Sequence, residues 1–368
     1  MSKNSKDIVF VAAQRSAIGR YKGIYKDLQA HNLGSLVIKS LIEKTKLKVD
    51  EIDEVILGQV LTGSCGQNPA RQAAINSGIP KEKTAIIINQ VCGSGLRSIV
   101  NGYQSLLTNS ANFIIAGGQE SMTNSIHDQM MKDGLTDAFY NYHMGVTAEN
   151  VAAKYNISRQ EQDEFALESQ QKANIAINKK KFDDEIINDD IDEHPRNGIT
   201  INDLSKLNSV FKEKGTVTPG NSSGINDGAA AVVLTKRELA EKHNLEILGK
   251  IISWATCGVD PSMMGLGPIP SSNKALEIAK WNVKDLDLIE INEAFAAQSI
   301  AVIKELKIPK EKVNVNGGAI ALGHPIGASG ARIVVSLLNE LKKMNGKKGL
   351  ATLCIGGGMG ISMCIEKD

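Results

Sequence analysis

The hydrophobic positions of the chain follow two alternating patterns. LGSLVIKSLIEK (33–44) has helical spacing and places Leu33, Leu36, Val37 and Leu41 on one face. Runs rich in β-branched residues predict buried strands, and the first four are DIVFVAA (7–13), DEVILGQVL (53–61), TAIIINQV (84–91) and NFIIAGG (112–118). Because helical patterns separate these runs, the sequence predicts a parallel or mixed α/β sheet.

The pattern changes in the middle of the chain. From about residue 119 to residue 224 the sequence is polar and has few strand-like runs. A helix is predicted to begin after Ser158, because Ser158 and Glu161 have the spacing of a capping box. The acidic segment DDEIINDDIDE (183–193) is typical of a solvated loop.

The α/β pattern returns after residue 224, and its predicted elements are GAAAVVLT (228–235), EILGKIISWAT (246–256), SNKALEIAKW (272–281), LDLIEIN (286–292), AFAAQSIAVIKEL (294–306) and the strand pair GLATLCIGGGMGISMCIE (349–366). The similar endings of FIIAGG and ATLCIGGG are consistent with a duplicated unit. We interpret the chain as a first α/β half (1–118), an insertion (119–224), a return to the first half (225–248) and a second half (249–368).

Composition excludes several functional classes. A net charge of +1 and 4% aromatic residues argue against nucleic acid and anionic membranes as partners. The apolar run 8–13 is too short for a signal peptide, and no stretch approaches the roughly 20 apolar residues of a membrane span. The five cysteines form no close pair, which favours free thiols in a reducing compartment. These features predict a cytoplasmic protein and no metal site.

Two residues stand where nucleophilic chemistry is expected. Cys92, in VCGSGL, lies where a strand feeds a helix, and a helix N-terminus favours a thiolate. A small core residue at a strand end is an equally good interpretation. His324 lies among glycines before Pro325, which fits the first turn of a following helix. Its imidazole suits a base for a thiol, although most lone histidines only hydrogen-bond a turn.

Two further stretches follow predicted strands. Cys354 precedes three glycines in CIGGGMG, whose amides can bind an oxyanion or simply form a hairpin turn. A dinucleotide fingerprint fits poorly, because no helical pattern follows. Asn292, in INEAFAAQ, can be a helix N-cap or can hold a water against negative charge. All four stretches lie at strand ends, where α/β folds build their sites.

Taken together, these stretches resemble the thiolase family. The segments that carry the resemblance are VCGSGL, NEAFAAQ, NGGAIALGHPIGASGAR, CIGGGMG, GQNPARQAA, AGGQESM, YHMGVTAEN, GNSSGINDGAA and GPIP. They extend over nearly the whole chain and are most similar to the biosynthetic acetoacetyl-CoA thiolases. The resemblance implies a thiolase fold, with two similar α/β halves in five layers (α-β-α-β-α) and an inserted loop domain that binds CoA and contributes oligomer contacts.

The resemblance also implies a reaction. Cys92, deprotonated by His324, would attack acetyl-CoA and become acetylated; Cys354 would take an α-proton from a second acetyl-CoA, giving acetoacetyl-CoA and CoA. The enolate oxygen would be held by His324 and by a water on Asn292. The backbone amides of Cys92 and Gly356 would hold the tetrahedral adduct. Coenzyme A is then a substrate and a product, and no separate cofactor is expected.

The family pattern assigns further residues to the substrate. Those expected along the pantetheine arm are Leu135, His143, Met144, Ser223 and Gly224. Met144, Met264 and Phe295 would close a pocket sized for a short acyl group, although methionines also fill ordinary cores.

The chain departs from the family pattern at two loops. Residues 121–132 and 183–209 are shorter than in typical members, where the first loop joins dimers into tetramers and the second carries basic residues near the CoA nucleotide. The resemblance therefore implies a homodimer, argues against a tetramer, and predicts a weaker hold on the nucleotide end, with Arg196 and Lys206 remaining there.

Three rival functions are weighed against this one. A β-ketoacyl synthase of the same fold would lack the cysteine of CIGGGMG. A catalytically silent acyl-CoA-binding protein would have lost Cys92, His324 or Cys354, and this chain keeps all three. A nicotinamide-dependent oxidoreductase lacks its phosphate fingerprint here.

Overall fold

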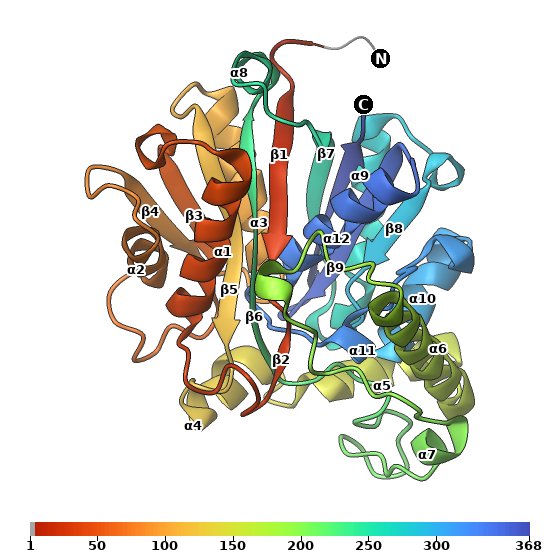
Figure 1. Cartoon of the computed structure of the whole chain (residues 1–368). Coiled ribbons are helices and arrows are strands. Elements are labelled where there is room, and N and C mark those ends of the chain that lie inside the picture. Colours follow the sequence, from red (N-terminus) through yellow and green to blue (C-terminus); the bar gives the residue numbers. More distant parts are fainter. Residues whose placement is uncertain (1–3) are drawn as a thin grey trace.

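A computed structural model describes residues 4–368 and shows two α/β halves joined along one path of hydrogen-bonded strands (Figure 1). In the first half the strand order is β4-β3-β5-β6-β1. Its elements are β1 (Ile8–Arg15), β2 (Gly19–Arg20), α1 (Ala30–Thr45), β3 (Glu54–Gly58), α2 (Pro69–Asn76), β4 (Thr84–Ile88), α3 (Ser94–Leu107), β5 (Phe113–Ser121), β6 (Asn226–Lys236) and α8 (Arg237–Lys242).

In the second half the strand order is β7-β10-β9-β8. Its elements are β7 (Gly249–Gly258), α9 (Pro268–Ala279), β8 (Leu288–Ile291), α10 (Ala296–Leu306), α11 (Ala319–Leu322), α12 (Ser329–Lys343), β9 (Lys348–Ile355) and β10 (Met359–Glu366). The halves meet where β1 pairs with β7 at Val9–Lys250 and Phe10–Gly249.

The two halves repeat one topology. Apart from the edge strand β4 and the two-residue β2, which lies off the path, the first sheet runs β3-β5-β6-β1 and the second runs β8-β9-β10-β7. When the four remaining strands of each half are numbered along the chain, their order in the sheet is second, third, fourth, first in both halves. The pairs β3–β5 and β8–β9 are parallel, and the remaining pairs of these two sets are antiparallel. The prediction of two similar halves with a mixed sheet is therefore confirmed.

Helices complete five layers. Figure 1 shows α1 and α2 outside the first sheet, α9 and α10 outside the second, and α3 and α12 between the sheets. The middle layer is apolar: Leu96 and Ile99 of α3 and Ile333 and Leu337 of α12 are fully buried in one core with strand residues of both halves. The α-β-α-β-α arrangement agrees with the sequence-based expectation.

Local signals in the sequence explain the outer helices. In α1, Leu33, Val37 and Leu41 are fully buried, as their helical spacing predicts. Helix α6 begins after Ser158, whose hydroxyl accepts the Glu161 amide while the Glu161 carboxylate accepts the Ser158 amide. This capping box confirms the predicted start of the helix.

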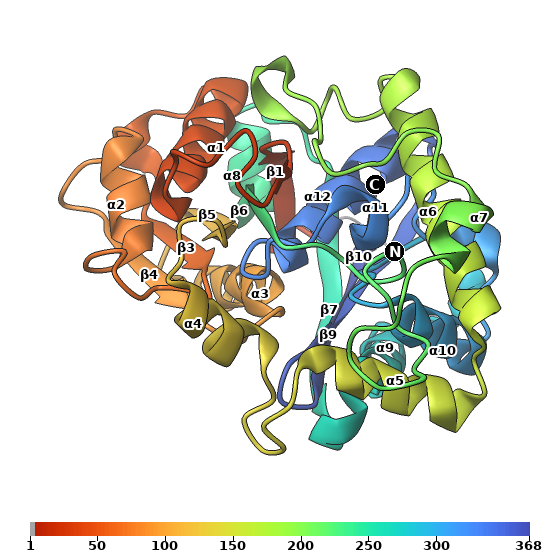
Figure 2. The same ribbon diagram turned by 90° about the horizontal axis from the view of Figure 1, so that it is seen from below.

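The named elements between β5 and β6 are all helices. They include α4 (His127–Gln129), a π-helical turn (Met130–Leu135), α5 (Met144–Tyr155), α6 (Arg159–Asn178) and α7 (Ile201–Ser205). Figure 2 shows these helices arranged around one end of the molecule, where α11 also lies. They surround the end at which the predicted site residues lie.

The prediction of a solvated loop at 183–193 is confirmed only in part, because Asp183, Asp184, Asp189 and Asp190 are exposed but two other acidic residues are buried. Glu185 and Asp192 are buried, and both bind the guanidinium of the fully buried Arg15, at 2.7 Å each. Glu193 accepts hydrogen bonds from the backbone amides of Arg20 and Ile24. The sequence pattern missed this because the cation that pairs with the segment comes from β1, about 170 residues earlier.

Of the helices formed by residues 4–368, none combines the length and the apolar character that a membrane crossing requires.

Candidate active site

Cys92 lies in a tight turn between β4, which ends at Ile88, and α3, which begins at Ser94. The preceding residue, Val91, has a left-handed φ of 46°, which is rare for a β-branched residue. Ser94 closes this turn, because its hydroxyl donates to the Val91 carbonyl at 2.6 Å and accepts the Gln90 amide at 2.9 Å. Backbone strain of this kind costs about 1–3 kcal/mol and is common at functional sites.

Backbone amides are directed at the Cys92 sulfur. Burial raises the pKa of the thiol to about 11, while the amides of Gly356 and of Cys92 itself act in the opposite direction. These are the two amides that the resemblance assigned to an oxyanion site. At neutral pH the thiol is protonated, so it needs a base before it can act as a nucleophile.

His324 lies in the loop between α11 and α12 and is buried. Its backbone amide donates to Asn226 Oδ1 at 2.9 Å, and its Nδ1 lies 2.5 Å from Ser329 Oγ. Burial, and secondly the positive charge of Arg332, lower the pKa of the imidazole to about 3. The ring is therefore neutral at pH 7 and able to accept a proton.

Two local expectations about this loop and its neighbour were wrong. Pro325 forms a turn before α12 and does not occupy its first turn, because the helix begins at Ser329. Asn292 is not a helix N-cap, because α10 begins only at Ala296. The Asn292 side chain is fully buried, and neither its oxygen nor its nitrogen has a partner among residues 4–368. Such a pair of unused polar atoms suits a bound water.

Cys354 is the penultimate residue of β9, and the turn after it joins β9 to β10 as a hairpin. Gly357 and Gly358 have φ values of 83° and 80°, which explains the glycines of this turn. At Gly356 a side chain would lie 3.2 Å from Val91, so glycine lets its amide approach Cys92 closely. Burial, and secondly the nearby Cys92, raise the pKa of the Cys354 thiol far above its usual value.

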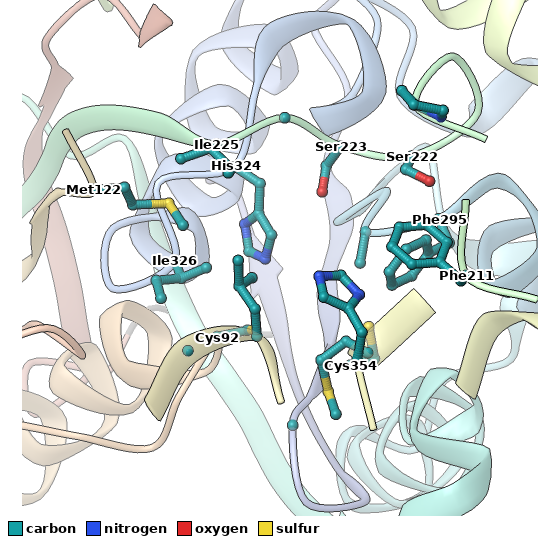
Figure 3. A pocket seen from close by; sticks show the side chains of 18 of the residues that line it. Cys92, Met122, Phe211, Ser222, Ser223, Ile225, Phe295, His324, Ile326 and Cys354 are labelled. Carbon is teal, nitrogen blue, oxygen red and sulfur yellow. The ribbon is translucent and has the colours of Figure 1, made fainter. Parts of the chain in front are cut away.

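The predicted residues meet in one cavity of about 310 Å³ (Figure 3). Figure 3 shows the side chains of Cys92, His324 and Cys354 converging on this space from separate elements. Asn292 does not line the cavity itself. The wall includes Gly356 and every residue expected along the pantetheine arm or at the acyl pocket, namely Leu135, His143, Met144, Ser223, Gly224, Met264 and Phe295. Lys206, expected near the nucleotide, does not line it.

The segment with Ser223 and Gly224 is fixed against the start of α10. The Ser223 amide donates to the Ala294 carbonyl at 3.0 Å, and the Ala296 amide donates to the Asn221 carbonyl at 2.9 Å. This contact pairs Ser222 with Phe295, although about 70 residues separate them in the chain.

Several wall residues were not predicted from the sequence. Phe211 stacks on His143 with ring centroids 4.5 Å apart and meets Phe295 edge to face at 6.3 Å. His194 also reaches the cavity, and its pKa is lowered to about 4 by burial and secondly by Arg196. No local motif marks Phe211 or His194, because both come from the inserted segment and reach the cavity only through its tertiary fold. Arg196, which was predicted near the CoA nucleotide, lines the same cavity.

A buried carboxylate supports the His324 loop from behind. Glu120, at the end of β5, accepts the amides of Val60 at 2.9 Å, Leu61 at 3.2 Å and Gly327 at 2.9 Å. Burial raises the pKa of this carboxyl to about 7, against the effect of the three amides. Glu120 therefore ties the loop with His324 to the loop that follows β3.

Comparison with known proteins identifies the class. The family model described as "Thiolase, N-terminal domain" matches residues 8–129 and 124–238, and "Thiolase, C-terminal domain" matches residues 245–367. The chain belongs to the thiolase family and is an acyltransferase.

Full-length relatives carry one name. The chain is 51% identical to a protein of Rhizobium meliloti named acetyl-CoA acetyltransferase, over 99% of this chain and 100% of the relative. It is 46% identical to the cytosolic acetyl-CoA acetyltransferase of Rattus norvegicus, over 100% of both chains. The alignment with the first relative spans 391 positions, more than the 368 residues of this chain, so that relative carries residues that are missing here.

Solved structures show the same fold. The chain resembles the acetyl-CoA acetyltransferase of Bacillus anthracis with a TM-score of 0.96 and 40% identity, covering 100% of both chains. It resembles human mitochondrial 3-ketoacyl-CoA thiolase in complex with CoA with a TM-score of 0.95 and 40% identity, covering 99% of this chain and 98% of that one. The thiolase fold is therefore established for this chain.

Proposed function

We propose that this thiolase is an acetyl-CoA acetyltransferase. It condenses two acetyl-CoA molecules into acetoacetyl-CoA and CoA, and it catalyses the reverse thiolysis. The observation that carries this proposal is the meeting of Cys92, Cys354 and the neutral His324 in one cavity. The full-length relatives named acetyl-CoA acetyltransferase support the choice of substrate.

In the first step His324 takes the proton of Cys92. The Cys92 thiolate attacks the thioester carbon of acetyl-CoA, and the oxyanion of the adduct accepts the amides of Cys92 and Gly356, which already point at the sulfur. When the adduct collapses, the C–S bond to CoA breaks. The imidazolium returns its proton to the CoA thiolate, leaving an acetyl thioester on Cys92.

In the second step Cys354 removes an α-proton from another acetyl-CoA. Burial raises the pKa of Cys354, so the thiol first passes its proton to Nε2 of the neutral His324, and the resulting thiolate is a strong base for a weakly acidic carbon. The enolate attacks the acetyl carbon on Cys92, and the Cys92 thiolate leaves and takes the proton back from the His324 imidazolium, while Cys354 keeps the α-proton. We propose that His324 and a water held by Asn292 stabilise the enolate oxygen, since both residues have unpaired buried polar atoms within residues 4–368.

The acyl pocket favours a short chain. Met144, Met264, Phe295 and Phe211 pack in one apolar cluster around Cys354. We propose that this cluster admits the acetyl and acetoacetyl groups and excludes long acyl chains. The pantetheine arm then lies along Leu135, His143, Ser223 and Gly224, which continue the same cavity.

The inserted segment 119–224 is proposed to carry most of the CoA contacts. Arg196 reaches the cavity, whereas the acidic residues nearby bind Arg15 and the loop at Arg20. With few cations left at this end, we expect the nucleotide of CoA to be held weakly. A strong dependence of the CoA affinity on salt or on the 3′-phosphate would contradict this expectation.

We further propose a homodimer that acts in the cytoplasm and in lipid metabolism. The edge strand β4 pairs only with β3 within residues 4–368, and Ile86 on it is 42% exposed, which suits pairing with a second copy. The short loop after Ser121 argues against a tetramer, so a tetrameric mass in dilute solution would refute that part. The free cysteines of the site require a reducing compartment.

The deciding experiment follows the loss of acetoacetyl-CoA when CoA is added. Turnover is expected for the natural chain, and its absence would favour a silent acyl-CoA-binding protein. Cys92→Ser should prevent acetyl-enzyme formation with labelled acetyl-CoA. Cys354→Ser should still become acetylated but fail to condense; normal condensation by this variant would contradict the assigned roles.

A further inference from the structure

Ser329 makes two hydrogen bonds that bear on the base. The residue is 1% exposed and opens α12, five positions after His324. Its Oγ lies 2.5 Å from His324 Nδ1 and 2.9 Å from the carbonyl oxygen of Pro325. Ser329 therefore bridges Nδ1 of His324 and a backbone carbonyl.

The direction of these bonds follows from the available protons. When Ser329 donates its single hydroxyl proton to the Pro325 carbonyl, which can only accept, its oxygen is an acceptor toward His324 and Nδ1 carries the proton of the neutral imidazole. The other nitrogen, Nε2, is left with its lone pair, and it is buried with no partner among residues 4–368.

We propose that Ser329 is a positioning residue that holds His324 in the Nδ1-protonated tautomer. This inference rests on the proposed function, in which Nε2 takes the proton of Cys92. No carboxylate within residues 4–368 hydrogen-bonds to the ring, so the hydroxyl acts as its orienting partner. When Nε2 gains a proton, the Nδ1–H···Oγ bond becomes charge-assisted and keeps the ring in place.

The tautomer can be observed directly. The chain has six histidines, and ¹⁵N-histidine labelling with His324→Asn as the assignment control isolates the signal of His324. The expected signal has a protonated Nδ1 and an unprotonated Nε2 in the natural chain, and a changed ratio in Ser329→Ala. A neutral ring protonated at Nε2 in the natural chain, or a ratio unchanged in Ser329→Ala, would overturn the proposal.

A second experiment measures how well His324 activates Cys92, and it needs no acyl-CoA. The rate at which iodoacetamide alkylates Cys92, followed by mass spectrometry of its peptide, should fall about tenfold or more in Ser329→Ala, since general bases contribute about 10²–10⁴. The matched control is Ser98→Ala. Ser98 is equally buried, and its hydroxyl donates only to the carbonyl four residues earlier, at 2.9 Å.

The outcomes separate the two proposals. Ser98→Ala should keep the natural alkylation rate, although it loses the same kind of helix bond. Equal losses in both serine variants, or no loss in Ser329→Ala, would show that Ser329 is only structural. If the natural chain fails to turn over acetoacetyl-CoA, the proposed function is wrong, but the tautomer and the alkylation rate still decide the role of Ser329.

Discussion

A close approach between α3, which follows Cys92, and the segment that carries His324 depends on a glycine. A side chain at Gly95, near the start of α3, would lie 2.8 Å from the Ala331 amide, 3.0 Å from the Gly327 carbonyl and 3.2 Å from the Ala328 carbonyl. All three are backbone atoms of the segment that carries His324. In Gly95→Ala, reaching an ordinary contact of 3.4 Å requires these backbones to separate by about 0.6 Å.

This separation should cost activity more than it costs stability. Overpacking of a core costs about 1–3 kcal/mol, and a protein with about 5–15 kcal/mol of stability stays almost fully folded after such a loss. A shift of this size between Cys92 and His324 is expected to lower kcat/KM by about 10–100-fold, since misplacement by 1 Å can cost about 100-fold.

Urea unfolding and thiolysis kinetics measure the two effects of Gly95→Ala separately. The control is Gly258→Ala, because a side chain there would meet only one atom, at 3.9 Å. Gly258→Ala should retain activity. An unchanged kcat/KM in Gly95→Ala, or an equal loss in the control, would refute the reasoning.

Three further predictions test the buried polar groups. Arg15→Ala should lower the free energy of unfolding by about 3–5 kcal/mol, because it leaves two buried carboxylates unpaired. Urea unfolding measures this loss, and Arg20→Ala is the control because the Arg20 side chain is 66% exposed. Similar losses in the two variants would contradict the prediction. Asn292→Ala should lower the condensation rate about 10²–10³-fold while single-turnover acetylation of Cys92 persists, if the Asn292 water stabilises only the enolate. The pKa of Glu120 is raised to about 7 in the folded protein, so the folded state binds the extra proton and stability falls as the pH rises from about 4.5 to 7. Glu120→Gln should flatten that part of the pH dependence of unfolding, and an unchanged slope would count against the raised pKa.

Much of the fold could be predicted from local patterns. The spacing of Leu33, Val37 and Leu41 and the capping box at Ser158 specify helices without knowledge of the rest of the chain. Cys92 was located because it follows a strand and Cys354 because it lies near the end of one, and strand ends meet at one place in such a sheet.

The remaining features depend on partners distant in sequence. The acidic segment near Asp192 reads as solvent-exposed until Arg15 is placed beside it. Asn292 was expected to be a possible helix cap because it stands between a strand and a helical pattern. In the structure α10 begins only at Ala296, where the contact with residues 221–223 fixes its start. Phe211 has no motif of its own and is recognisable only once it stacks on His143.

The repeated strand order means that the active site is assembled from two similar halves. Helices α3 and α12 occupy equivalent places in their halves, each leading into the third strand of its sheet, and their N-terminal ends carry Cys92 and the His324 loop respectively. Each repeat therefore supplies what its counterpart lacks. Neither repeat expressed alone would be competent, whereas two separately made fragments that reassociate along the β1–β7 seam would restore the complete set of reactive groups.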